Sequence, residues 1–326
     1  MTRRTLGFLA SFVMVMAVTV VAQRPASKQA GTWELTPGRA ALYGTWDFAT
    51  LTPLERPDGV KGPTFTPEEL EKFMEPIRNI ENTRGKPDGK GGLTNGNYPR
   101  IYMDDGDDFL EGNRSSQIID PPDGKLPYAD KDRQRRAPER SLAAPRQTAN
   151  DPEDMGPTNR CLVGVNSGPP LWPLSYNNVV MIIPGRDKTV IMAEQIHAVR
   201  IVRMNTREHL PAKMRTWGGD SVGWWEGDTL VVETTNFDPR FVFQGGSQNM
   251  RLMERFTAGG PHGGIVYEYT VHDPDTYSRP WTARIPMRKA KVGIIEYACH
   301  EGNYSMTNSL RGARETEKTK KADSRP

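Results

Sequence analysis

Residues 217–237 read WGGDSVGWWEGDTLVVETTNF, and this stretch predicts a β-hairpin. Val222–Glu226 is short, apolar and aromatic, and Thr229–Thr235 is rich in β-branched residues, as strands are. Between them lies Gly227-Asp228, a two-residue turn with glycine in its first position, as a type II′ turn requires. The stretch therefore indicates an antiparallel β fold.

The turn also determines which residues of the hairpin face each other. With Gly227-Asp228 at the tip, Trp225 should pair with Leu230 and Trp224 with Val231. Alternate residues of a strand point to opposite faces, so one tryptophan should lie inside and the other outside or under a loop. An inward tryptophan is either core or a wall on which a ligand ring stacks.

Short apolar segments separated by turn formers continue through the second half of the chain. We predict further strands at Tyr43–Leu51, Asn178–Ile183, Thr189–Ile196, Val199–Met204, Met250–Thr257, Ile265–Val271, Trp281–Met287 and Gly293–Cys299. Such a series indicates a mainly β fold, an antiparallel meander that closes into a barrel or sandwich. No repeat of constant period is visible, which argues against a propeller.

The first half of the chain is less regular. Thr66-Pro67-Glu68-Glu69 combines an N-cap, a proline at the first helical position and a capping box, and it predicts one short helix to about Asn79. Residues 83–160 are dense in Gly, Pro, Asp, Asn and Arg, so we expect long loops that wrap the core. They contain one candidate strand, Ser116–Ile119.

The N-terminus has the pattern of a secretory signal peptide. Arg3 and Arg4 precede the apolar run Leu6–Ala22, with cleavage expected before Gln23. The run is shorter than the roughly 20 apolar residues of a spanning helix, so we expect export to the periplasm or the extracellular space without stable membrane insertion after cleavage. The expected organisation is a signal peptide at 1–22, a linker at 23–42, one β-rich domain at 43–311 with its loop-rich region at 83–160, and a disordered charged tail at 312–326.

Charge and cysteine content narrow the class of protein. The chain has 43 basic and 40 acidic residues, and removal of Arg3 and Arg4 with the signal leaves 41 against 40. This near-neutral balance is not the footprint of a nucleic-acid-binding protein. In an exported chain Cys161 and Cys299 are expected to form a disulfide, with two free thiols as the alternative.

Several motifs resemble those of an uncharacterised family of secreted bacterial proteins of acidobacterial and sphingomonad type. They are residues 44–57 (GTWDFATLTPLERP), 119–124 (IDPPDG), 217–237 and 296–304 (EYACHEGNY). The resemblance covers most of the mature chain and implies an exported single unit, but it implies no activity. Gly44-x-Trp46 is also similar to the Gly-x-Trp of lipocalins, which implies a lipocalin-like barrel that holds one small ligand.

Two pairs of residues could perform acid–base chemistry. Glu194 and His197 are three apart and would share a site only if the strand bulges or bends near Ile196. Their spacing suits a metal pair on a helix, but the surrounding pattern is that of a strand, so no metal is expected. His300 and Glu301 follow Cys299, where they either act as a general acid and base or cap a turn. We predict that His197 and His300 face one cavity.

Two classes of function remain open. The first is a protein that binds a small, partly polar ligand in a barrel or cleft. The residues expected to contact the ligand are Trp224, Trp225, Arg200, Asp220 and Tyr297. The alternative is a hydrolase, lyase or isomerase that uses His197, His300, Glu194 and Glu301 as catalytic residues. No organic cofactor is expected, since the sequence contains no phosphate loop, dinucleotide fingerprint or serine elbow. Convergence of these side chains in one pocket would favour the enzyme.

Overall fold

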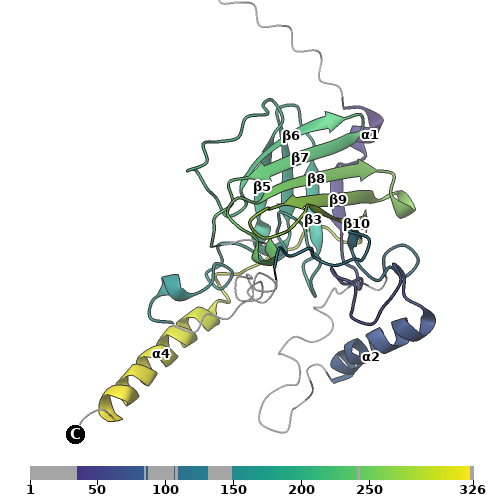
Figure 1. The fold of residues 1–326 in the computed structure, drawn as a ribbon. Helices are drawn as coiled ribbons and strands as arrows, with labels where there is room; N and C mark the ends of the chain where they lie inside the picture. Colours follow the sequence, from purple (N-terminus) through teal and green to yellow (C-terminus); the bar gives the residue numbers. More distant parts are fainter. Residues whose placement is uncertain are drawn as a thin grey trace, which may run out of the picture. The chain divides into compact units, whose positions relative to one another are not determined.

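Nine strands of the described residues close into a barrel in the computed structural model of the protein (Figure 1). The structure describes residues 35–83, 86, 106, 109–130, 149–240 and 243–323. In their order around the barrel the strands are β1 (Gly44–Asp47), β3 (Val179–Ile183), β4 (Lys188–Ala193), β5 (Val199–Arg203), β6 (Asp220–Glu226), β7 (Thr229–Thr235), β8 (Arg251–Ala258), β9 (Ile265–His272) and β10 (Trp281–Lys289). β10 pairs back with β1, and the short strand β2 (Ile118–Asp120) also pairs with β10. The predicted mainly β fold, a meander closing into a lipocalin-like barrel, is confirmed.

Pairing around the barrel is antiparallel with one exception. β5 and β6 are parallel, and their register partners are Arg203 and Val222. A parallel pair needs a crossover connection, and residues 204–219 supply it. This crossover loop is important for the polar cluster described below.

The hairpin has the register that its turn predicts. Trp225 is paired with Leu230, and Trp224 with Val231. Trp225 packs against the core, with the guanidinium of Arg39 5.1 Å from the centre of its ring. Trp224 is on the other face, where it donates to the exposed Glu226. The expected division of the two tryptophans is confirmed.

Three α-helices accompany the barrel in the described part of the chain: α1 (Pro37–Ala40), α2 (Pro67–Thr83) and α4 (Tyr304–Asp323). The described residues also contain four 3₁₀ turns: η2 (Pro152–Asp154), η3 (Gln195–His197), η4 (Phe243–Gly245) and η5 (Pro261–Gly263). The predicted capping box of α2 is formed, since the Glu69 amide donates to Thr66 Oγ1 at 3.2 Å and the Thr66 amide donates to Glu69 Oε2 at 2.9 Å. None of these helices has both the length and the apolar content that crossing a membrane requires.

The structure differs from the sequence-based prediction at the C-terminal end. Residues 293–299, predicted as a strand, are irregular, because β9 on one side and β1 and β2 on the other already pair with β10. The expected disordered tail is helical up to Asp323, with ion pairs Arg314–Glu317 and Lys318–Glu315 one turn apart. The predicted signal peptide and most of the linker lie outside the described residues, as does part of the region 83–160.

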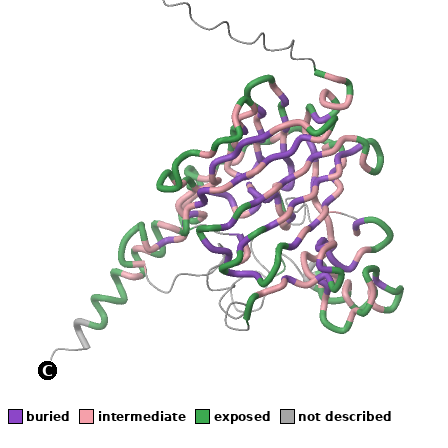
Figure 2. Tube along the Cα trace, turned by 45° about the horizontal axis from the view of Figure 1, so that its top comes forward, coloured by how far each residue is buried: buried purple, intermediate pink, exposed green. Residues whose placement is uncertain are grey.

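The barrel interior is a side-chain core. Burial alternates along the strands (Figure 2), and Tyr267, Tyr269 and Val271 of β9 point inward as their spacing predicts. Phe256 stacks on Tyr267 with ring centres 4.7 Å apart, and Trp281 meets Tyr269 edge to face. Small barrels commonly fill their interiors with side chains in this way.

An ion pair is buried within this core. The Arg200 guanidinium of β5 is bonded to both carboxylate oxygens of Glu254 of β8, and Glu254 is fully buried. The Tyr267 hydroxyl donates to Glu254 Oε1 at 2.8 Å and accepts from the Leu171 amide at 3.0 Å. Burial, together with the charge of Glu254, raises the pKa of Tyr267, so the phenol stays protonated and able to donate. The pair connects β5 and β8, two strands that β6 and β7 separate in the sheet.

Replacing Glu254 by Gln should destabilise the protein strongly, because it leaves the Arg200 charge buried without its counter-ion. The expected loss is about 3–5 kcal/mol in the free energy of unfolding, measured by urea denaturation. Glu268→Gln on β9 is the matched control: it breaks a partly exposed pair with Arg284 and should cost at most about 1 kcal/mol. Equal losses in the two variants would contradict this account.

Candidate functional site

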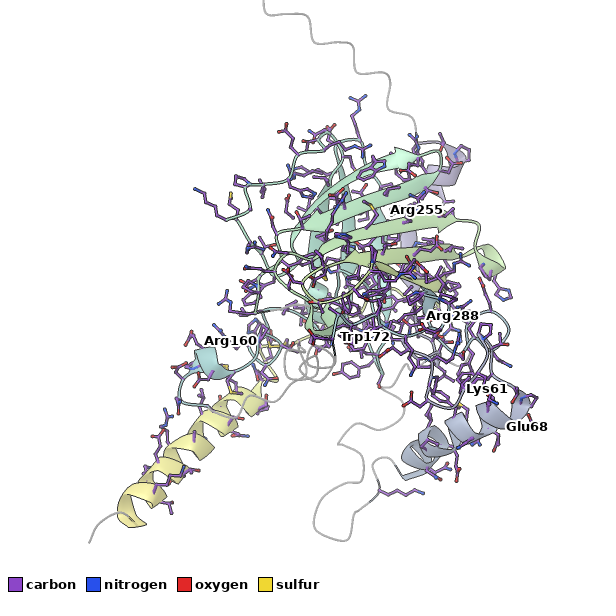
Figure 3. All side chains as sticks on the ribbon, in the orientation of Figure 1. Lys61, Glu68, Arg160, Trp172, Arg255 and Arg288 are labelled. Carbon is purple, nitrogen blue, oxygen red and sulfur yellow. A yellow bond between two sulfur atoms is a disulfide. The ribbon has the colours of Figure 1, made fainter. Side chains whose placement is uncertain are left out.

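A cavity of about 900 Å³ lies against the outer face of the barrel where β1, β3 and β10 meet. Asp47, Val179 and Arg288 line it from these strands, and Arg288 is labelled in Figure 3. The opposite wall is residues 290–303, which we call the wall segment. Its lining residues include Ala290, Lys291, Val292, Ile295, Glu296, Tyr297, Ala298, Cys299, Gly302 and Asn303. The volume is in the range of small-molecule sites.

A disulfide holds the wall segment in place. Cys161 and Cys299 are bonded, with Cα atoms 5.9 Å apart and 138 positions between them in sequence, so the predicted disulfide is confirmed. Both cysteines line the cavity, and Asn303 Nδ2 donates to the Asn159 carbonyl at 2.7 Å. A disulfide of this kind is typical of an oxidising compartment.

Hydrogen bonds attach the middle of the wall segment to the barrel. The Ile295 amide donates to Glu194 Oε2 at 3.4 Å, and His197 Nε2 donates to the Ile295 carbonyl at 3.0 Å. At its start the Ala290 amide donates to the Thr45 carbonyl of β1 at 3.0 Å. The segment is thus held at both ends and once between them.

Glu194 reaches the cavity because the chain bends directly after β4. Its amide still donates to the Val179 carbonyl of β3 at 2.9 Å, and its Oε1 accepts from Asn177 Nδ2 at 2.7 Å. Ile196 and His197 then adopt left-handed backbone angles, with φ of 52° and 48°. The bend that a shared site of Glu194 and His197 requires is therefore present, but the His197 imidazole is turned to the Ile295 carbonyl and does not line the cavity.

Left-handed backbone conformations are concentrated at this site. Cys161 (φ 56°) and Asn177 (φ 57°) line the cavity, and Ile196 and His197 adjoin Glu194. Asparagine tolerates this region, whereas a β-branched isoleucine is a true outlier there. Such residues cost on the order of 1–3 kcal/mol each and are found preferentially at functional sites.

The cavity combines apolar and charged groups. Val292 and Ile295 are 64% and 58% exposed, and the half-exposed Tyr176 also lines the cavity. Asp47 accepts from Arg288 Nε at 2.7 Å, so these two charges neutralise each other. Glu194 is only 4% exposed, and among the described residues it accepts from the Asn177 side-chain amide and the Ile295 backbone amide and forms no ion pair.

The other residues predicted for the site are dispersed. Tyr297 lines the cavity as Glu194 does, but His300 and Glu301 are exposed and do not line it. Arg200 and Trp225 face the barrel interior. Trp224 lies on the outer face, with the Arg207 guanidinium 3.6 Å from its ring centre, and Asp220 belongs to a separate polar cluster.

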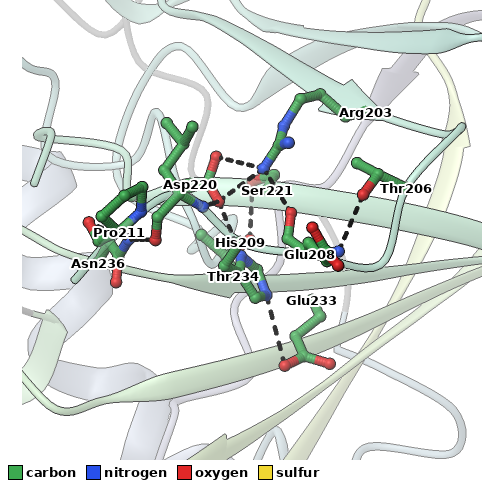
Figure 4. A network of polar contacts seen from close by, with 12 residues as sticks. Arg203, Thr206, Glu208, His209, Pro211, Asp220, Ser221, Glu233, Thr234 and Asn236 are labelled. Carbon is green, nitrogen blue, oxygen red and sulfur yellow. Dashed lines mark hydrogen bonds and ion pairs between the residues drawn. The ribbon is translucent and has the colours of Figure 1, made fainter. Parts of the chain in front are cut away.

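That cluster, shown in Figure 4, contains His209, which the sequence analysis did not single out. Asp220 accepts from Arg203 Nη2 at 2.9 Å, from His209 Nδ1 at 2.8 Å and from the Leu210 amide at 2.9 Å. His209 Nε2 lies 3.5 Å from Glu233 Oε1, an ion-pair distance without a hydrogen bond. His209 follows a polar stretch without strand or motif pattern, so only the fold reveals its partners.

The cluster fastens the crossover loop to the outer face of the barrel. Burial raises the pKa of Asp220, but the Leu210 amide, His209 and Arg203 together outweigh burial and lower it. The hydroxyl of the neighbouring Ser221 is buried and bonded to Thr234 Oγ1 at 2.8 Å. Because Asp220 already binds its donors within the chain, we assign this cluster a structural role.

The described residues contain no group of three His, Cys, Asp or Glu side chains that could hold a metal ion. No protein family, no curated protein and no solved structure matches the chain.

Replacing Asp220 by Asn should destabilise the protein by about 1.5–3 kcal/mol at neutral pH, because charge-assisted hydrogen bonds are lost. The pKa of Asp220 is below its usual value of 3.8 in the folded protein. On acidification the Asp220 carboxylate is therefore protonated at a higher pH in the unfolded chain than in the folded protein. The stabilisation is fully present above pH 3.8 and is lost as the pH falls through the folded-state pKa. Urea denaturation at pH 7 and about pH 3 should show the difference from wild type narrowing in acid.

Glu315→Gln, which removes an exposed pair with Lys318 on α4, is the control for this measurement. It should change the free energy of unfolding by no more than a few tenths of a kcal/mol. A difference between Asp220→Asn and wild type that is the same at both pH values would show that the carboxylate charge is not what fastens the loop.

Proposed function

We propose that the protein binds a small, partly polar ligand in the cavity between the barrel and the wall segment. The observation that carries this proposal is the convergence of a buried carboxylate and exposed apolar side chains on one cavity of about 900 Å³. Pockets for small molecules have this composition, an apolar lining with a few polar groups that orient the ligand. Exposed Val292 and Ile295 gain an apolar partner when a ligand occupies the cavity.

The cavity is a better candidate than the barrel interior. The interior holds the aromatic core and the Arg200–Glu254 pair, whose hydrogen-bonding groups are bonded to one another. A ligand there would have to displace buried side chains. On the outer face, a ligand has only to replace water between existing walls.

The arrangement favours binding over acid–base catalysis. An acid–base enzyme of the kind considered above needs its histidines and carboxylates within hydrogen-bond reach of one substrate. His197 donates to a backbone carbonyl, and neither His300 nor Glu301 lines the cavity. Glu194 is thus the one member of that set in the cavity lining.

We also propose that the protein works outside the cytoplasm. The apolar run after Arg3 and Arg4 supports export, and the Cys161–Cys299 disulfide supports an oxidising compartment. The disulfide lies in the cavity wall, so oxidation and the binding site are linked.

Filling the cavity should abolish binding. N-Phenyl-1-naphthylamine, an uncharged probe that fluoresces in apolar surroundings, should bind the wild-type protein saturably. Ala298 lines the cavity and is exposed, so Ala298→Trp should reduce probe affinity at least about tenfold, because each 1.4 kcal/mol of lost contact is a factor of ten, with little change in melting temperature.

Ala212→Trp is the matched control, since Ala212 is exposed on the crossover loop and does not line the cavity. It should bind the probe as wild type does. Equal binding by both tryptophan variants, or no saturable binding by wild type, would overturn the proposed function.

A further inference from the structure

We infer that the ligand carries a positively charged amine that Glu194 binds. This inference rests on the proposed function and specifies its ligand class, a primary amine attached to an apolar body. It follows from the state of Glu194, which is a buried carboxylate that lines the cavity and accepts only from neutral donors among the described residues.

A buried carboxylate needs either a counter-ion or a full set of donors. Elsewhere in the described chain this need is satisfied internally: Glu254 and Asp220 have arginine partners, and Asp273 accepts from the Ser247 amide and hydroxyl at 2.5 and 2.7 Å. Glu194 Oε1 accepts one good bond, but its Oε2 accepts only at 3.4 Å. Oε2 therefore keeps acceptor capacity that none of the described residues uses.

The surrounding charges leave this carboxylate uncompensated. The lining includes three acidic side chains, Asp47, Glu194 and Glu296, and two basic ones, Arg288 and Lys291. Arg288 is paired with Asp47, and Lys291 and Glu296 are exposed and screened by water. The buried negative charge of Glu194 is thus the one that a bound cation would neutralise.

A second polar atom at the cavity has acceptor capacity that the described residues leave unused. Thr158 lines the cavity, and its Oγ1 is buried with no hydrogen-bond partner among the described residues. An ammonium group has three donors, so it could bond to Glu194 and to a hydroxyl acceptor together. The apolar part of such a ligand would contact Val292 and Ile295 at the exposed rim.

The test compares three probes of nearly equal size: 2-phenylethylammonium, 2-phenylethanol and 3-phenylpropionate. Each is titrated against wild-type protein loaded with N-phenyl-1-naphthylamine, and displacement gives its affinity. We expect the ammonium compound to bind at least about tenfold more tightly than the alcohol, as hydrogen bonds to charged groups imply, and the carboxylate to bind most weakly.

Glu194→Gln keeps the size of the side chain, but it removes the charge and turns one of the two acceptor oxygens into an amide donor, so it should abolish the preference for the ammonium compound. Glu301→Gln is the matched control, because Glu301 belongs to the same wall segment but is exposed and does not line the cavity. It should change the ratio of the two affinities less than about twofold. Melting temperatures of both variants identify any failure to fold.

The outcomes separate this inference from the proposed function. Displacement by all three probes with equal affinity, or tightest displacement by the carboxylate, would overturn the amine assignment while the cavity remained a binding site. Absence of saturable probe binding would overturn both. If Glu194→Gln does not fold, the ratio of ammonium to alcohol affinity on the wild-type protein decides the question without a variant.

Discussion

The pairing of β1 with both β3 and β10 is the constraint on which the rest of the structure depends. β1 has four residues, and it closes the ring where Trp46 and Asp47 face Lys289 and Arg288 across more than 240 positions of sequence. The Trp46 indole donates to the Leu42 carbonyl at 2.9 Å, which orients the strand from its N-terminal side. Gly44, with φ of 136°, permits a backbone conformation that L side chains rarely adopt.

The closure of the barrel by β1 also explains why a cavity exists where β1, β3 and β10 meet. Both edges of β10 are occupied, so the chain after Lys289 has no strand to join and passes along the outer face. Ala290 stays near β1 through the Thr45 carbonyl, and Cys299 is held by Cys161. A segment held at its two ends, over a wall that presents Asp47 and Arg288, encloses space rather than filling it.

The sequence predicts what is encoded locally. The hairpin register follows from a two-residue turn, and the capping box of α2 follows from four consecutive residues. The predicted strand at 293–299 was wrong for a non-local reason, because its apolar residues suit a strand but both edges of the preceding strand β10 are already paired. Similarly, the alternation along β8 shows that Glu254 shares a face with Leu252 and Phe256, but it does not reveal Arg200 as the partner.

The candidate site shows the same limit. Glu194 and Tyr297 could be selected from sequence as polar groups at predicted strand ends, and both line the cavity. What the sequence could not indicate is that Glu194 is 4% exposed, that the wall segment covers it, and that His197 is turned away to the Ile295 carbonyl. These properties come from contacts about 100 positions apart, which no local pattern contains.

The energetics of the site argue that its shape is maintained for a purpose other than stability. Left-handed Ile196, a buried carboxylate with no cationic partner among the described residues, and exposed Val292 and Ile295 are each unfavourable for the folded state alone. Single features of this kind occur in many proteins. Here Ile196 adjoins Glu194, and Glu194, Val292 and Ile295 line one cavity. The proposed ligand would relieve the two features that involve solvation, because its ammonium group would neutralise the carboxylate while its apolar body covered the rim. On that proposal, the backbone strain at Ile196 would hold Glu194 at the position where the ligand meets it.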